Sequence, residues 1–78
     1  MEDRKFEALL ATVLKIPSAR ITDDLAMRDV EAWDSLKHME LIASLEETYN
    51  IQLTFDEIVT MQSVGQIKQV LKQRGAIS

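Results

Sequence analysis

The stretch WDSLKHMELIASLEETYN, residues 33–50, decides the fold. Its strong apolar side chains recur at the spacing of one helix face: Leu41, Ile42, Leu45 and Tyr49. Asp34 or Ser35 can cap the start of this helix, because either side-chain oxygen accepts a hydrogen bond from a first-turn amide. Asn50 is a suitable residue to end it. The pattern therefore predicts a helix over about residues 35–49.

Upstream of this helix, a second apolar face precedes a long connection. The face consists of Phe6, Leu9, Leu10, Val13 and Leu14. It predicts a helix over about residues 3–15 that ends at Ile16, because Pro17 disfavours helical backbone before it and has no N–H to donate. Residues 17–33 show no helical period, so we expect a long loop held to the core by isolated apolar anchors. These anchors are Ile21, Leu25, Met27, Val30 and Trp33.

Downstream, two segments have the capping-box spacing that opens a helix. The segment 54–57 (TFDE) predicts a short helix over about residues 55–61, and the segment 63–66 (SVGQ) predicts a helix over about residues 64–74 that stops near Gly75. No segment has the alternating pattern of a strand. We therefore expect an all-α fold, a small antiparallel four-helix bundle with three longer helices and a short third one, in which residues 1–78 form a single domain.

Composition excludes several functions. The chain has 78 residues, no cysteine and one histidine, so it offers no disulfide and no thiolate metal site, and we expect no metal. Its start lacks the pattern of a signal peptide and no apolar run could span a bilayer, so we expect a cytoplasmic protein. We also expect the protein to be a monomer. Residues 21–57 contain ten acidic and two basic side chains, a net charge of −8. Such a surface disfavours nucleic acid and favours a basic protein partner.

The predicted central helix has a second, mixed face opposite its core face. At about 100° per residue, Leu36 falls among acidic and small residues: Glu40, Ala43, Glu46 and Glu47, with Met39 nearby. Ser35 precedes Leu36 at the helix N-terminus, where the helix dipole and free amides favour an anion. A phosphate on Ser35 would therefore be electrostatically favoured.

Two catalytic or metal-binding interpretations fit the same region poorly. A nucleophile at Ser35 would need His38 as base and Asp34 as orienting group, but His38 points with the core arc. We expect a partly buried histidine there. The acidic residues 23–34 lack the spacing and the glycine of a calcium-binding EF-hand loop.

The sequence resembles the acyl carrier proteins and, more loosely, the peptidyl and aminoacyl carrier domains. The likeness extends over nearly the whole chain and rests on the stretch 33–36 (WDSL), on the glutamates five, eleven and twelve residues after Ser35, and on the capping-box helix that contains Asp56 and Glu57. It implies a free-standing carrier, not an enzyme, in the acyl-carrier-protein fold.

The resemblance also implies a cofactor and its binding site. A phosphopantetheinyl transferase (holo-acyl-carrier-protein synthase) would attach 4′-phosphopantetheine to Ser35, flanked by Asp34 and Leu36, and the carrier would hold acyl or aminoacyl cargo as a thioester. The partner-binding face would comprise Leu36, Glu40, Ala43, Glu46, Glu47, Asp56 and Glu57. Its partners would be loading ligases or transferases and downstream synthases of fatty-acid, polyketide or other specialised pathways, with basic docking surfaces. In the family the cargo can lie between helices, and Met39, Ile42, Leu45 and Val59 are the candidates to line such a cleft. For each of the four, however, we expect core packing instead.

Three positions differ from the pattern typical of fatty-acid carriers. Lys37 stands where an acidic residue is usual, and His38 replaces a small polar residue. Ala32 and Trp33 occupy the approach to Ser35, where glycine is frequent. These differences favour a carrier of a specialised pathway. An alternative from another class is an unprimed helical adaptor that uses the acidic face only to bind proteins.

Overall fold

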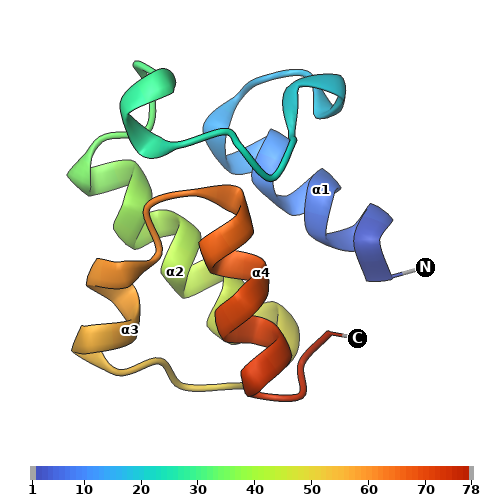
Figure 1. Ribbon diagram of the computed structural model, residues 1–78, viewed down its shortest axis with the longest axis vertical. Helices are drawn as coiled ribbons and strands as arrows, with labels where there is room; N and C mark the ends of the chain where they lie inside the picture. Colours follow the sequence, from blue (N-terminus) through green and yellow to red (C-terminus); the bar gives the residue numbers. More distant parts are fainter. Residues whose placement is uncertain (1, 78) are drawn as a thin grey trace.

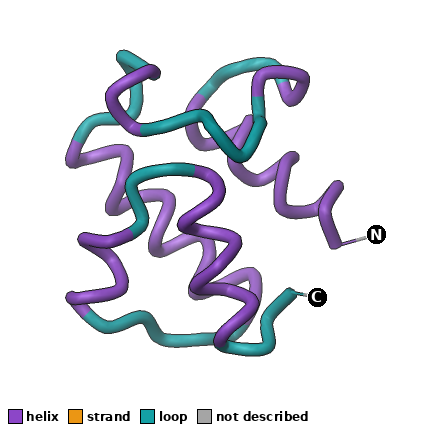
Figure 2. Tube along the Cα trace, viewed as in Figure 1, coloured by secondary structure: helices purple, strands orange, loops and turns teal. Residues whose placement is uncertain are grey.

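The computed structural model describes residues 2–77 as a bundle of α-helices joined by loops and 3₁₀ turns (Figures 1 and 2). The α-helices are α1 (Glu2–Leu14), α2 (Ser35–Tyr49), α3 (Phe55–Thr60) and α4 (Val64–Gln73). Two short 3₁₀ turns, η1 (Ser18–Arg20) and η2 (Met27–Asp29), lie within the long loop between α1 and α2. Within residues 2–77 the only strand-like pairing is an isolated bridge between Ala26 and Ser63. The predicted all-α fold, with a short third helix, is confirmed.

Helices α2, α3 and α4 begin at side-chain caps. Asp34 accepts a hydrogen bond from the amide of Lys37 at 2.9 Å, so Asp34 and not Ser35 is the cap of α2. Thr54 and Glu57 form the predicted reciprocal capping box of α3. At α4 the serine cap forms as expected, but the reciprocal bond differs. Gln66 accepts from the amide of Gln62, one residue before the cap, at 3.1 Å.

The three longer helices end in the same way. Shortly after each of these helices the backbone adopts a positive φ, in the left-handed region. The φ angle is 58° at Lys15, 55° at Asn50 and 73° at Gly75. After each of them an amide reaches back five residues: Ile16 to Ala11, Ile51 to Glu46, and Ala76 to Leu71. This is the bond of a Schellman motif, which satisfies a carbonyl at a helix end. Helix α1 therefore ends at Leu14, before the proline predicted to stop it.

The core lies where the helices and the long loop meet. Its buried members come from α1 (Phe6, Leu10, Leu14), α2 (Leu41, Ile42, Leu45), α4 (Val64, Ile67, Val70, Leu71) and the connections (Ile21, Leu25, Val30, Trp33, Met61, Ile77). The predicted loop anchors are thus confirmed as core residues, except that Met27 is only partly buried. Leu9, Val13 and Tyr49 also pack at the core's edge.

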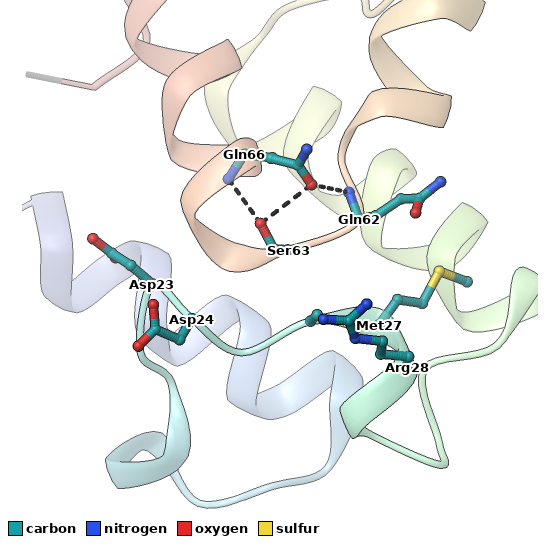
Figure 3. A pocket seen from close by; sticks show the side chains of 8 residues that line it. Asp23, Asp24, Met27, Arg28, Gln62, Ser63 and Gln66 are labelled. Atoms are coloured by element: carbon teal, nitrogen blue, oxygen red, sulfur yellow. Dashed lines mark hydrogen bonds between the residues drawn. The ribbon is translucent and has the colours of Figure 1, made fainter.

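The long loop, which arches over one end of the bundle in Figure 1, is joined to the start of α4 by backbone bonds. Met27 donates to the carbonyl of Gln62 at 2.8 Å, and Val64 donates to the carbonyl of Leu25 at 2.9 Å. Gly65 lies so close that a Cβ atom there would be 3.2 Å from the carbonyl oxygen of Asp23. A polar hollow opens beside this junction (Figure 3). These bonds fix the loop that leads into α2.

An ion pair adds a side-chain contact between the loop and α4. The ammonium of Lys68 lies 2.9 Å from a carboxylate oxygen of Asp23, and its hydrogen bond holds the pKa of Asp23 below the usual range. The same ammonium lies 5.8 Å from the ring centre of Phe6 in α1. Lys68, on α4, therefore interacts with two other parts of the fold, the loop and α1.

Candidate functional site

Ser35 is the first residue of α2, and its side chain is exposed to solvent. On its N-terminal side, Trp33 is 2% exposed and belongs to the core, while Asp34 has extended backbone and caps the helix. A buried indole and a helix cap thus hold the two residues before Ser35. The hydroxyl is presented at the helix end, with solvent in front of it.

The electrostatics of this helix end suit an anion. The amide of Lys37 is bonded to Asp34, and the amide of His38 is bonded to the carbonyl of Asp34 at 2.8 Å. The amides of Ser35 and Leu36 precede the first intrahelical bond and have no carbonyl partner within the helix. They lie at the positive end of the helix dipole. A phosphodiester on the exposed hydroxyl of Ser35 would therefore fit this end of the helix.

The structure does not assemble a nucleophilic triad around Ser35. His38 is buried, and both of its ring nitrogens are occupied: Trp33 Nε1 donates to Nδ1 at 3.1 Å, and Nε2 lies 2.9 Å from the carbonyl oxygen of Ile58. The Asp34 carboxylate binds the Lys37 amide instead of an imidazole. The expected hydrogen-bonded histidine is confirmed and is more fully buried than expected, and neither His38 nor Asp34 is hydrogen-bonded to the hydroxyl of Ser35.

The part of the predicted partner-binding face on α2 is mostly exposed, but one of its negative charges is balanced by a lysine. Leu36 is 72% exposed, and Ala43 and Glu47 are exposed further along the helix. Glu40 is exposed too, but its carboxylate lies 3.0 Å from the ammonium of Lys37. Lys37 therefore balances Glu40, which is the acidic residue of this face that lies nearest to Ser35 in the sequence.

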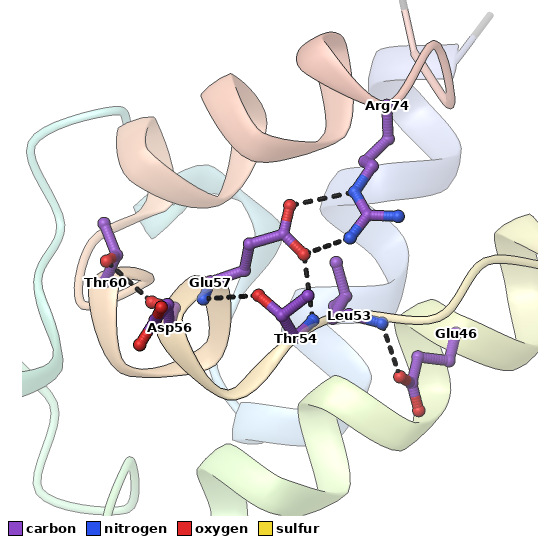
Figure 4. A network of polar contacts seen from close by, with 7 residues as sticks. All are labelled: Glu46, Leu53, Thr54, Asp56, Glu57, Thr60 and Arg74. Atoms are coloured by element: carbon purple, nitrogen blue, oxygen red, sulfur yellow. Dashed lines mark hydrogen bonds and ion pairs between the residues drawn. The ribbon is translucent and has the colours of Figure 1, made fainter.

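Two further glutamates of that face take part in contacts that hold the fold (Figure 4). Glu46 is half-buried and accepts a hydrogen bond from the amide of Leu53 at 2.8 Å. Glu57 accepts two hydrogen bonds from the guanidinium of Arg74 as well as the capping bond from Thr54.

The bond from Arg74, together with that from Thr54, lowers the pKa of Glu57 to about 2. Asp56, next to Glu57, is exposed. Among the acidic residues of the predicted face, Glu40, Glu46 and Glu57 thus have carboxylates in ion pairs or hydrogen bonds within the chain. The carboxylates of Glu47 and Asp56 take no part in these bonds.

The structure also separates the four residues assigned to a cleft or to the core. Ile42 and Leu45 are buried core residues, but Met39 and Val59 are 53% and 45% exposed. Phe55, which sequence reasoning did not single out, is 75% exposed at the start of α3. Core packing of Met39 and Val59 was therefore the wrong expectation, because their faces of α2 and α3 turn outward.

Residues 2–77 provide no helix with the length and apolar content needed to cross a bilayer. Across the same residues, no cluster of three or more histidine, aspartate or glutamate side chains is placed to bind a metal ion.

Comparison with known proteins assigns the family. The family model described as "Phosphopantetheine attachment site" matches residues 4–71. The chain is 33% identical over 72 residues to an acyl carrier protein of Buchnera aphidicola subsp. Baizongia pistaciae, with 91% of each chain covered. It is 27% identical over 66 residues to an acyl carrier protein of Saccharopolyspora erythraea, with 85% of this chain and 70% of that protein covered.

The described residues form a small helical bundle in which an exposed serine begins α2. The chain belongs to the acyl carrier protein family. Members of this family are carriers and not catalysts, and the matching family model implies a covalently attached phosphopantetheine group.

Proposed function

We propose that the phosphopantetheine group is attached to Ser35 and that the protein shuttles acyl or aminoacyl intermediates between the enzymes of a biosynthetic pathway. The observation that carries this proposal is the exposed hydroxyl of Ser35 at the first turn of α2, inside the segment Asp34-Ser35-Leu36. When bound, the group would supply the thiol that holds cargo, a function that a chain without cysteine cannot provide.

The surroundings of Ser35 support transfer by a separate enzyme. His38 is held by Trp33 and Ile58 and cannot take the hydroxyl proton, so the base must come from a phosphopantetheinyl transferase. The first-turn amides and the helix dipole of α2 would then stabilise the phosphodiester anion. This chain's own contribution is to present the hydroxyl and to favour the charge of the product.

The further partners in this proposal are a loading ligase or transferase and downstream synthases. The pathway would be fatty-acid, polyketide or other specialised synthesis. The Lys37–Glu40 ion pair supports a specialised pathway, because it neutralises the acidic residue of the partner-binding face nearest to Ser35 in the sequence and so changes the charge that a partner meets there. The cytoplasmic location expected from the sequence stays a prediction.

The test is incubation with coenzyme A and a phosphopantetheinyl transferase, followed by intact-mass measurement. The parent chain should gain the mass of one phosphopantetheine, and Ser35→Ala should gain none. Ser18→Ala is the matched control, because Ser18 is also an exposed first residue of a helical turn, but of the three-residue η1. It should be modified like the parent. A parent that stays unmodified with several active transferases would remove the proposal.

A further inference from the structure

Trp33 and His38 occupy the two positions of a staple at the start of α2. Asp34 is the N-cap, so Trp33 directly precedes the cap and His38 is the fourth residue of the helix. In a hydrophobic staple these two positions carry apolar side chains, whose contact fixes the angle at which the chain enters the helix. Here the indole Nε1 of Trp33 donates to Nδ1 of His38 at 3.1 Å, with the ring centres 6.2 Å apart. The entry into α2 is therefore fixed by a directional hydrogen bond.

Both rings of this staple are buried. Trp33 is 2% exposed and His38 is 8% exposed, so the two rings are shielded from an enzyme that approaches the surface. A buried donor that loses its acceptor costs free energy, which favours the one arrangement of the two side chains that keeps the bond. Any influence of the pair on Ser35 must therefore pass through the chain between them.

The segment between the two rings contains Ser35 and is closed by further bonds. The amide of Lys37 donates to the carboxylate of Asp34 at 2.9 Å, and the amide of His38 donates to the carbonyl of Asp34 at 2.8 Å. The side chain of Ser35 is exposed to solvent between these anchored residues. The direction of its hydroxyl is thus set by the ends of the segment, Trp33 and His38.

The second ring nitrogen of His38 ties this helix start to α3. Nε2 lies 2.9 Å from the carbonyl oxygen of Ile58, in the last turn of α3, where carbonyls have no partner within the helix. The imidazole is therefore held from both sides. An apolar side chain at position 38 could pack against the indole, but it could neither accept the indole N–H nor donate to Ile58.

We propose that His38 is a positioning residue for the attachment reaction: its bond to Trp33 sets the direction in which the first turn of α2 presents the hydroxyl of Ser35. The inference rests on the attachment of phosphopantetheine at Ser35. In that reaction the Ser35 oxygen forms a bond to the pantetheine-side phosphorus of coenzyme A. The pyrophosphate bond breaks, adenosine bisphosphate leaves, and the hydroxyl proton passes to a base of the transferase. The attacking oxygen must lie in line with the leaving group, and a displacement of about 1 Å can cost about 100-fold in rate.

The experiment separates the two bonds of His38 by means of amide side chains. In His38→Asn the shorter side chain brings its oxygen near the position of Nδ1, so it can still accept from Trp33 but does not reach Ile58. In His38→Gln the longer side chain brings its nitrogen near the position of Nε2, so it keeps the bond to Ile58 and loses the one from Trp33. Trp33→Phe removes the donor itself.

Each variant is incubated with coenzyme A and an excess of a phosphopantetheinyl transferase, and intact-mass spectra give the single-turnover rate at increasing transferase concentrations. His38→Gln and Trp33→Phe should lower the maximal rate by about tenfold. The half-saturating transferase concentration should stay within about twofold of the parent, because the altered side chains are buried. His38→Asn should keep the maximal rate within about twofold, since it restores the acceptor.

A matched control separates positioning from loss of stability. Ile67→Val removes a buried methyl group in α4 without touching the pair, and it should leave both kinetic values unchanged. Every assay is run below the thermal midpoint of the least stable variant, so that only folded chains are compared. Maximal rates of His38→Gln and Trp33→Phe within about twofold of Ile67→Val would overturn the proposal. Equal losses in His38→Asn and His38→Gln would overturn it too, because the bond from Trp33 would then not be the cause.

The outcomes also separate this inference from the proposed function. Attachment at Ser35 is tested by the mass measurement on the parent chain. A parent that is modified elsewhere or not at all contradicts both proposals. A parent that is modified at Ser35, with unchanged rates in the variants, contradicts the positioning role of His38 alone.

Discussion

The indole Nε1 of Trp33 donates a hydrogen bond to Nδ1 of His38 at 3.1 Å, so the two residues enclose the segment that contains Ser35. An indole N–H can only donate, which requires His38 Nδ1 to be the acceptor. The proton of the neutral ring must then be on Nε2, which donates to the carbonyl of Ile58 near the C-terminus of α3. The imidazole of His38 thus links Trp33, two residues before Ser35, to the C-terminal part of α3.

The first prediction is the tautomer of His38. Nitrogen-15 NMR at neutral pH should show a protonated Nε2 and an unprotonated Nδ1. His38→Ala should lower the free energy of unfolding by about 1–3 kcal/mol, because it leaves the buried N–H of Trp33 without a partner. Trp33→Phe removes that donor, so combining the two substitutions should cost less than the sum of the single ones. A protonated Nδ1, or strictly additive losses, would contradict this arrangement.

The bundle could be predicted from the sequence because local signals and apolar periodicity agree. The core face of α2 and the cap at Thr54 follow from side-chain spacing and chemistry, whereas the sequence narrowed the cap of α2 to Asp34 or Ser35. The end of α1 could not be predicted, because Lys15 in the left-handed conformation has no sequence signal comparable to Asn50 or Gly75.

The second prediction concerns this strained helix end. Lys15→Gly should raise the free energy of unfolding by about 0.5–1 kcal/mol, because glycine adopts positive φ without the steric cost that a Cβ atom imposes. Ala8→Gly in the exposed middle of α1 is the opposite-sign control and should lower it by about 1 kcal/mol. Urea unfolding measures both. Destabilisation by Lys15→Gly would contradict the assigned backbone conformation.

The third prediction is a pH dependence carried by Glu57. Its pKa is lowered from 4.5 to about 2, chiefly by the hydrogen bond from Arg74. Since the folded pKa lies below the unfolded one, the stabilisation is present above pH 4.5 and is lost as the pH falls towards 2. The difference in urea midpoint between the parent and Glu57→Gln should therefore be largest near neutral pH and shrink in acid. A difference that stays constant over this range would be inconsistent with the ion pair.

The candidate site could be predicted from the sequence only in part, because some of its features depend on contacts between distant segments. Ser35 and Asp34 are defined by local chemistry, so their places at the helix end could be inferred. The environments of the glutamates depend on contacts outside their own helix, which a helical projection does not show. Glu57 accepts a hydrogen bond from Arg74, which follows α4, and Glu46 accepts one from the amide of Leu53. The exposure of Met39 and Val59 likewise depends on how α3 packs against α2.

The measurement that tests the central claim most directly is fragmentation mass spectrometry of the intact protein isolated from its native cell. The account predicts one phosphopantetheine on Ser35, with or without bound cargo, and no such group on Ser18, Ser44 or Ser63. A protein that is active in its pathway but carries the group on another residue, or carries none, would contradict the account.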